Sequence, residues 1–103
     1  MKILVPGHRY VADNFEAKEN GQTIQFIQKE PISEASTEMT TVSDGTTNEE
    51  VLEVLLDRLN FLNKKFPCRE NALAITHIEI ARNFLFQRTR DRENRKVEGL
   101  HSA

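Results

Sequence analysis

A proline divides the second half of the sequence into two stretches of helical periodicity. Before Pro67, apolar side chains recur at helical spacing at Val51, Leu55, Leu59, Leu62 and Phe66. After it, a second stripe consists of Ala74, Ile78, Ala81 and Leu85. Proline disfavours helical backbone at the residue before it, so the first helix should stop near Lys65. The pattern predicts helices over 46–66 and 69–95 that fold back on each other as an antiparallel hairpin.

The first helix carries a strong start signal. Thr46 and Thr47 each stand three positions before a glutamate, Glu49 and Glu50 respectively, just ahead of the apolar run. This arrangement gives two overlapping capping boxes, in which a threonine hydroxyl and a glutamate satisfy free backbone donors. The acidic side chains also suit the positive end of the helix dipole.

The first 45 residues carry strand patterns. A short β-prone run opens at Arg9, residues 23–29 alternate partly between apolar and polar, and residues 37–42 alternate weakly. The pair Asn20-Gly21 is a signal for a hairpin turn. These runs predict a small antiparallel meander over 1–45.

Composition limits the size and class of the protein. The chain has 103 residues, of which 38% are hydrophobic and 29% charged, as expected for one globular domain over 1–103. The fold class is α+β: a small N-terminal antiparallel β-sheet, a C-terminal two-helix hairpin, and a polar tail over 96–103. So short a domain buries a modest share of its surface, and oligomerisation commonly adds the missing burial.

The same composition predicts a cytoplasmic protein. Cys68 is the single cysteine, so no internal disulfide can form. No apolar run approaches the roughly 20 residues of a membrane span, and the N-terminus lacks the pattern of a signal peptide.

Charge is distributed unevenly along the chain. Residues 1–57 hold eleven acidic and four basic side chains, whereas residues 58–103 hold five acidic and ten basic ones. Such asymmetry indicates an anion-binding half, or halves that attract each other between subunits. A solvated, charged helix end explains it equally well.

Arginines continue the stripe of the second helix. Arg88, Arg92 and Arg95 follow Leu85 at the same spacing, so the pattern places arginine on the face that should be buried. Residues four apart point the same way, and Arg88 and Arg92 would form a two-pronged clamp suited to phosphate. The alternative is a solvated helix end whose cations favour the dipole. The acidic chain and the lack of an aromatic platform argue against nucleic acid.

The sequence contains no catalytic or cofactor motif. His8, His77 and His101 have no carboxylate or cysteine companions at metal-ligand spacing. Cys68 has no base partner for a role as nucleophile, and no glycine-rich phosphate loop is present. We therefore expect no metal, no cofactor and no enzymatic activity.

Four segments of the chain resemble the phage Thoeris anti-defence protein 1 family. These segments are Gly7–Glu16, Gly21–Glu30, Asp44–Asn71 and Thr76–Gly99, and the most specific stretch is GTTNEEVL. The resemblance implies an N-terminal β-sheet followed by a helical hairpin that is shared with anti-CBASS protein 2.

The resemblance also implies a function. Members act as sponges that sequester cyclic ADP-ribose isomers, of the glycocyclic type, so that the Thoeris effector is never activated. Some members also bind cyclic di- or trinucleotides of CBASS defence at separate sites in a hexamer. By similarity, the ligand-contacting positions are Phe61, Asn71, Arg88 and Arg92. The implied partners are the cyclic nucleotide and further copies of the chain, with no DNA, RNA or membrane.

Helix geometry predicts that this site needs two subunits. At about 1.5 Å of rise per residue, Arg88 and Arg92 lie some 30 Å from the turn, whereas Phe61 and Asn71 lie within about 10 Å of it. Two hairpins packed head to toe would bring both groups to one ligand. Two other functions stay open: a cyclic-nucleotide hydrolase, and an interaction module that docks an acidic partner on its basic helix end.

Overall fold

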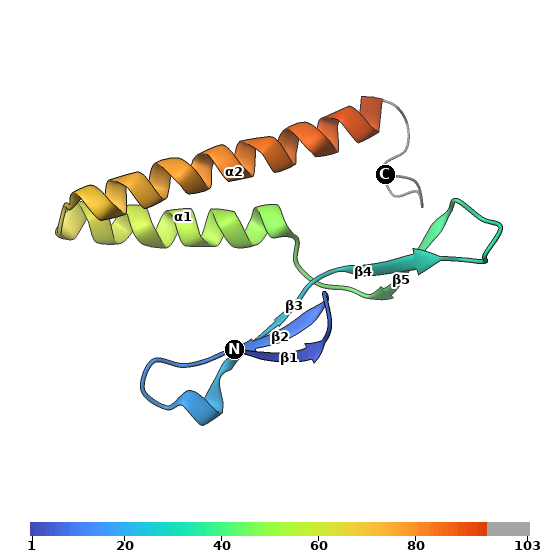
Figure 1. The fold of residues 1–103 in the computed structure, drawn as a ribbon, viewed down its shortest axis with the longest axis horizontal. Helices are drawn as coiled ribbons and strands as arrows, with labels where there is room; N and C mark the ends of the chain where they lie inside the picture. Colours follow the sequence, from blue (N-terminus) through green and yellow to red (C-terminus); the bar gives the residue numbers. More distant parts are fainter. Residues whose placement is uncertain (95–103) are drawn as a thin grey trace. The chain divides into compact units, whose positions relative to one another are not determined.

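The computed structural model describes residues 1–94, which form two compact units (Figure 1). Residues 1–47 contain the strands, and residues 48–94 contain two long helices. This order confirms the α+β class with a hairpin of helices at the C-terminal side. The single domain predicted over 1–103 stays a prediction, and Arg95, His101 and the predicted tail lie outside the described residues.

Three strands form an antiparallel sheet in the order β1-β2-β3. Their bounds are Lys2–Val5, Arg9–Ala12 and Gln22–Gln25. Tyr10 lies opposite Ile3 on one side and Ile24 on the other. Its ring meets that of Phe26 nearly edge-on, with 5.9 Å between the centroids and 83° between the planes. Cross-strand neighbours of this kind stabilise a sheet, and they give this one an apolar row.

Strand β1 is missing from the sequence-based prediction. It joins β2 through a tight turn in which the His8 N–H donates to the Val5 carbonyl at 2.9 Å. Gly7 has a positive φ of 81°, and Pro6 precedes it, as in a type II turn. The Pro-Gly pair between two β-prone runs is the signal that could have revealed β1.

Strands β4 (Gln28–Pro31) and β5 (Met39–Ser43) form a separate antiparallel ribbon. The run over 23–29 is therefore two strands, not one. The hairpin turn predicted at Asn20-Gly21 is also wrong, because a longer connection with a 3-10 turn joins β2 to β3, and Gly21 has a φ of −65°. A two-residue turn built on Asn-Gly needs positive φ.

Helices α1 (Asn48–Lys65) and α2 (Arg69–Asn94) follow the strands. Helix α1 begins directly after Thr47, which is the position that the second predicted capping box requires. Thr46 instead pairs with β3: its N–H donates to the Gln25 carbonyl at 2.8 Å. Its backbone is thus committed to the sheet, so the box predicted on Thr46 is wrong.

The two helices pack through a narrow stripe. Leu56 and Ile75 are the buried residues of the described chain. On α2 the less exposed positions are Asn71, Ala74, Ile75, Ile78, Arg82, Leu85, Thr89 and Arg92. Ala81 and Arg88 are exposed, which corrects the prediction that both lie on the buried face. Apart from Ala74, which is next to Ile75, the spacing alternates between four and three residues, as it does where two helices pack side by side.

Side-chain and backbone hydrogen bonds fix the three-residue connection between the helices. The Phe66 N–H donates to the Leu62 carbonyl at 2.9 Å, as the end of α1 requires. The Cys68 N–H donates to Asn63 Oδ1 at 3.1 Å, and the Asn71 N–H donates to Cys68 Sγ at 3.4 Å. Cys68 thus caps the start of α2 with its sulfur in place of the usual hydroxyl or carboxylate.

The packing predicts that Ile75→Ala destabilises the protein far more than Ile80→Ala. Ile75 is 8% exposed and Ile80 is 46% exposed on the same helix. Truncating a buried isoleucine costs about 2–5 kcal/mol, since it removes contacts and leaves a cavity. Urea denaturation followed by circular dichroism measures both variants. Equal losses of unfolding free energy would contradict the assigned packing.

The cap predicts an order of stability at position 68. Serine accepts the Asn71 N–H more strongly than cysteine does, and alanine cannot accept it. We expect Cys68→Ser to be the most stable protein and Cys68→Ala the least, with about 0.5–2 kcal/mol between the two variants. Thermal unfolding measures the order, and a Cys68→Ala protein as stable as Cys68→Ser would show that the sulfur does not cap α2.

Candidate ligand-binding site

Phe61 lies on α1 near the turn of the hairpin. Its side chain is 53% exposed, and the Lys65 ammonium stands 4.7 Å from the centre of its ring. This cation–π contact holds the lysine over one face of the ring. An exposed aromatic ring beside a cation is suited to stack on a flat group that carries negative charge nearby.

Asn71 lies in the first turn of α2, at the same end of the hairpin. It is half-buried, and its backbone is held by the sulfur of Cys68. A primary amide both donates and accepts hydrogen bonds, so it can match a base edge or a ribose hydroxyl. The structure therefore brings the two residues Phe61 and Asn71 to one end of the hairpin.

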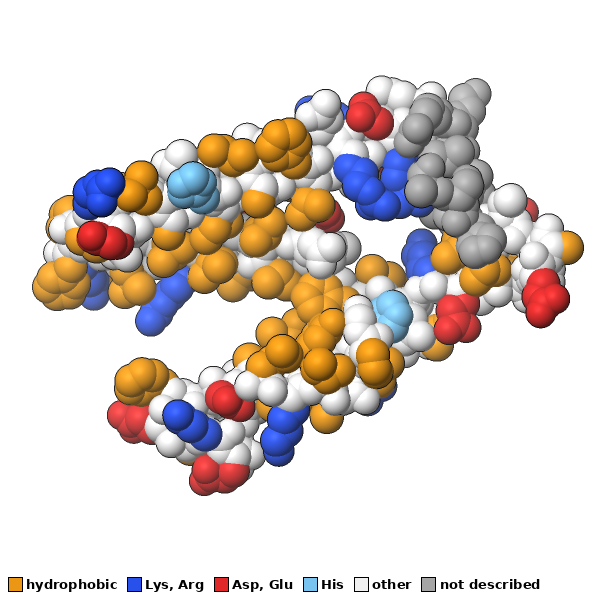
Figure 2. All heavy atoms as spheres, viewed as in Figure 1, with side chains coloured by type: hydrophobic (Ala, Val, Ile, Leu, Met, Phe, Trp, Pro, Cys, Tyr) orange, Lys and Arg blue, Asp and Glu red, His pale blue; other side chains and the backbone are white. Residues whose placement is uncertain are grey.

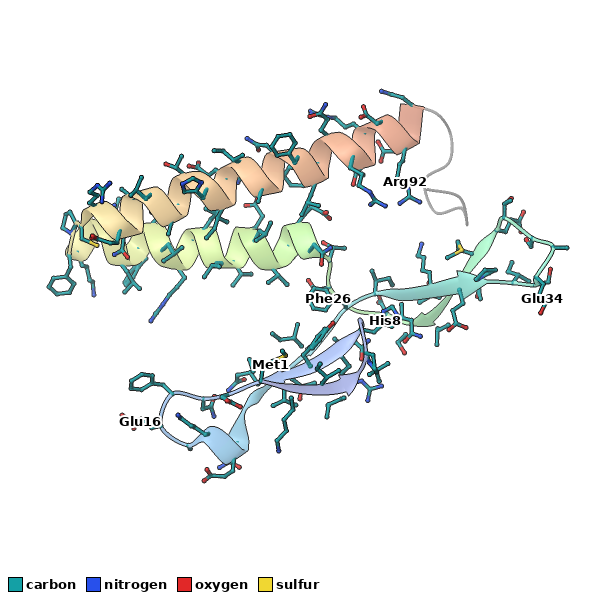
Figure 3. All side chains as sticks on the ribbon, in the orientation of Figure 1. Met1, His8, Glu16, Phe26, Glu34 and Arg92 are labelled. Atoms are coloured by element: carbon teal, nitrogen blue, oxygen red, sulfur yellow. The ribbon has the colours of Figure 1, made fainter. Side chains whose placement is uncertain are left out.

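Arg88 and Arg92 lie toward the other end of α2. Arg88 is exposed and Arg92 is half-buried, and Arg92 points to the side of α2 on which α1 lies (Figure 3). Basic side chains gather over this end of the helix (Figure 2). Four residues apart on one helix, the two guanidinium groups share a flank.

A single hairpin does not bring the two pairs together. Helix α2 runs without a break from Arg69 to Asn94, so Arg88 stands roughly 25 Å along the axis from Asn71 at 1.5 Å per residue. The four predicted positions thus fall into two pairs at opposite ends of the hairpin, and each pair is a candidate half-site.

The arginine end also extends past the other helix. Glu53 of α1 forms an ion pair with Arg82 of α2 at 3.0 Å. Because the helices are antiparallel, a residue a given number of positions before Glu53 lies opposite the residue the same number of positions after Arg82. Since α1 begins at Asn48, five residues before Glu53, its start lies opposite residue 87 of α2. Arg88 and Arg92 therefore lie on a segment with no α1 residue opposite, which we call the overhang, residues 88–94 (Figure 1). The helical periodicity of the sequence did not reveal this overhang.

Apolar side chains cover much of the face of the hairpin that Figure 2 shows. The large exposed apolar side chains of the two helices are Val54, Leu55, Phe61, Phe66, Leu73, Ile80, Phe84 and Phe86. Leu55 and Phe66 were predicted to be in the buried stripe of α1, and both are exposed. Contiguous exposed apolar surface marks an interaction site more often than a free surface.

A hollow of about 470 Å³ lies along α2 between residues 80 and 90. Its lining combines apolar and polar side chains: Ile80, Asn83, Phe84, Phe86, Gln87 and Arg90. None of the four residues predicted by resemblance lines it.

Within residues 1–94, no three His, Cys, Asp or Glu side chains gather where they could hold a metal ion. Neither helix has an apolar stretch long enough to cross a membrane.

Comparison with known proteins places the hairpin in a family. The family model described as "Acb2/Tad1, hairpin domain" matches residues 22–90. A curated relative, "Thoeris anti-defense 1" of Bacillus phage SBSphiJ7, is 47% identical over 60 residues. That match covers 57% of this chain and 42% of the relative, so it spans less than half of the relative's length. Because the family model covers more than half of the chain, including all of α1 and most of α2, the protein belongs to the Acb2/Tad1 hairpin-domain family.

Proposed function

We propose that the protein is a phage anti-defence sponge, which binds cyclic ADP-ribose isomers of Thoeris immunity and sequesters them without cleavage in the cytoplasm of the infected bacterium. The match of the family model to the hairpin carries this proposal. The name of the relative, "Thoeris anti-defense 1", supports the same role. The resemblance extends the cargo to cyclic oligonucleotides of CBASS, bound at a separate site.

The proposed site forms between two copies of the chain. Each copy holds one half-site at the turn and one on the overhang, so two hairpins packed head to toe complete two equivalent pockets. The exposed apolar side chains of α1 and α2 supply the surface for this packing. Such dimers could then assemble into the hexamer that the resemblance implies.

The four side chains divide the recognition of the ligand. Arg88 and Arg92 bind the pyrophosphate, and each charge-assisted hydrogen bond contributes on the order of 1.5–3 kcal/mol. Phe61 stacks on the adenine, a contact worth roughly 1–3 kcal/mol in single-stranded nucleic acid sites. Because Lys65 covers one face of the ring, the base stacks on the opposite face. Asn71 hydrogen-bonds a base edge or a ribose hydroxyl.

Capture of a ligand requires fewer functional groups in the protein than catalysis does. A sponge must bind the ground state of its ligand tightly, whereas an enzyme must bind the transition state more tightly than the substrate. Preorganised guanidinium forks and a stacking ring meet the first demand. A general base placed against the phosphate would be needed for the second.

The sponge mechanism predicts that the ligand is recovered intact. The protein is incubated with a cyclic ADP-ribose isomer, separated from free ligand and denatured by heat, and the supernatant is analysed by chromatography. We expect one unchanged nucleotide peak at all incubation times, since no bond is broken. Heat-treated ligand without protein is the control, and a time-dependent product would show an enzyme instead.

The fork geometry predicts that lysine cannot replace arginine at the site. We expect Arg88→Lys with Arg92→Lys to weaken binding at least about tenfold, since lysine keeps the charge but loses the parallel hydrogen bonds to phosphate. Isothermal titration calorimetry measures the affinity. Arg58→Lys, an exposed position on α1, is the matched control and should bind as the wild type does. Full affinity in the double variant would show that positive charge alone is sufficient for binding, as at a docking site for an acidic protein.

A further inference from the structure

An arginine occupies the packing stripe of the hairpin where an apolar residue is expected. Arg82 lies between Ile78 and Leu85 on the face of α2 that meets α1, and its side chain is 23% exposed. A charge at such a position is costly unless it is paired, and positions of this kind can fix the geometry of a packed structure.

The contacts of Arg82 join the two helices. Its Nη1 donates to Glu53 Oε1 across the hairpin at 3.0 Å. Its guanidinium carbon stands 6.0 Å from the centre of the Phe86 ring, one turn further along α2. Its Nε is buried and has no hydrogen-bond partner within residues 1–94. The side chain is thus clamped between α1 and the residue that leads into the overhang.

The location of this cluster relates it to the candidate site. Glu53 lies five residues from the start of α1, so the ion pair joins the two helices near the end of the hairpin at which α1 begins. The next residues of α2 on the same chain lead to Arg88 and Arg92, for which α1 offers no opposite residue. Without the ion pair, only apolar contacts would hold α2 against the first residues of α1. A small rotation of α2 at this point would displace the overhang by a larger amount, because the overhang lies further along the helix.

We propose that Arg82 is a positioning residue, which together with Glu53 and Phe86 braces α2 so that the overhang presents Arg88 and Arg92 at a fixed angle to the ligand. This inference rests on the proposed function for the identity of the ligand. The brace itself is a property of the hairpin and can be tested without a ligand.

The first test compares affinity with stability. Arg82→Met removes the charge and keeps much of the side-chain volume, and Glu53→Gln removes the partner charge. With the wild type and both variants fully folded, titration calorimetry with a cyclic ADP-ribose isomer should give an affinity loss of about tenfold, because a misplacement of about 1 Å at a binding group can have large effects. Arg58→Met is the control and should bind normally.

A charge swap separates positioning from simple stabilisation. Glu53→Arg combined with Arg82→Glu rebuilds the pair in the opposite sense, and it should recover most of the affinity that each single change loses. Variants that unfold at lower temperature but bind as tightly as the wild type would overturn the proposal, since Arg82 would then contribute to folding alone.

The second test measures the overhang directly. Spin labels are attached at Asp57→Cys and Glu93→Cys in a Cys68→Ser background, and labelled chains are diluted with unlabelled protein so that distances within one chain dominate. Pulsed electron paramagnetic resonance should give a narrow distance distribution, which Arg82→Met broadens or shifts. An unchanged distribution would overturn the brace. If the wild type binds no isomer while the distribution still broadens, the proposed ligand is wrong and the brace stands.

Discussion

The narrow packing of α1 against α2 is the constraint on which the rest of the molecule depends. Within residues 1–94 only Leu56 and Ile75 are buried, so the other apolar side chains of each helix stay at least partly exposed. Hydrophobic stabilisation scales with the apolar area removed from water, and little is removed inside one copy. Association of copies would supply the missing burial, and in the proposed head-to-toe arrangement the same contact completes the ligand site.

Local sequence chemistry was sufficient to predict the hairpin. Pro67 and the glutamates after Thr47 act within one helical turn, so they predict where α1 begins and where it ends. The rotation of each helix was harder to predict. Leu55 and Leu56 are neighbours in an apolar run, and periodicity cannot tell which flank meets the other helix when a second flank is also apolar. The predicted stripe therefore contained Leu55, which is exposed, and left out Leu56, which is buried.

The strands were even harder to predict from local sequence patterns. Gly21 has an extended backbone and lies close against Ala12 of β2, so the Asn20-Gly21 pair does not form the tight turn that it favours elsewhere. Arg82 was overlooked because its partner Glu53 is 29 residues away, and no local pattern connects them. Of the candidate site, the identities of the four residues came from family resemblance. The distance between the two half-sites followed from helix geometry, and the overhang became visible only once the register of the hairpin was known.

The unequal lengths of the two helices affect how the size of the bound ligand can evolve. Helix α1 has 18 residues and α2 has 26, and the short connection aligns them at one end, so the whole difference of about two turns projects at the other. In the proposed pair of hairpins, this projection sets how far the arginines of one copy reach toward the turn of its twin. Insertion of a single turn would extend the reach by about 5.4 Å while every contacting side chain stays the same. The size of the captured molecule is then a matter of helix length, which evolution can alter in discrete steps without redesigning a pocket.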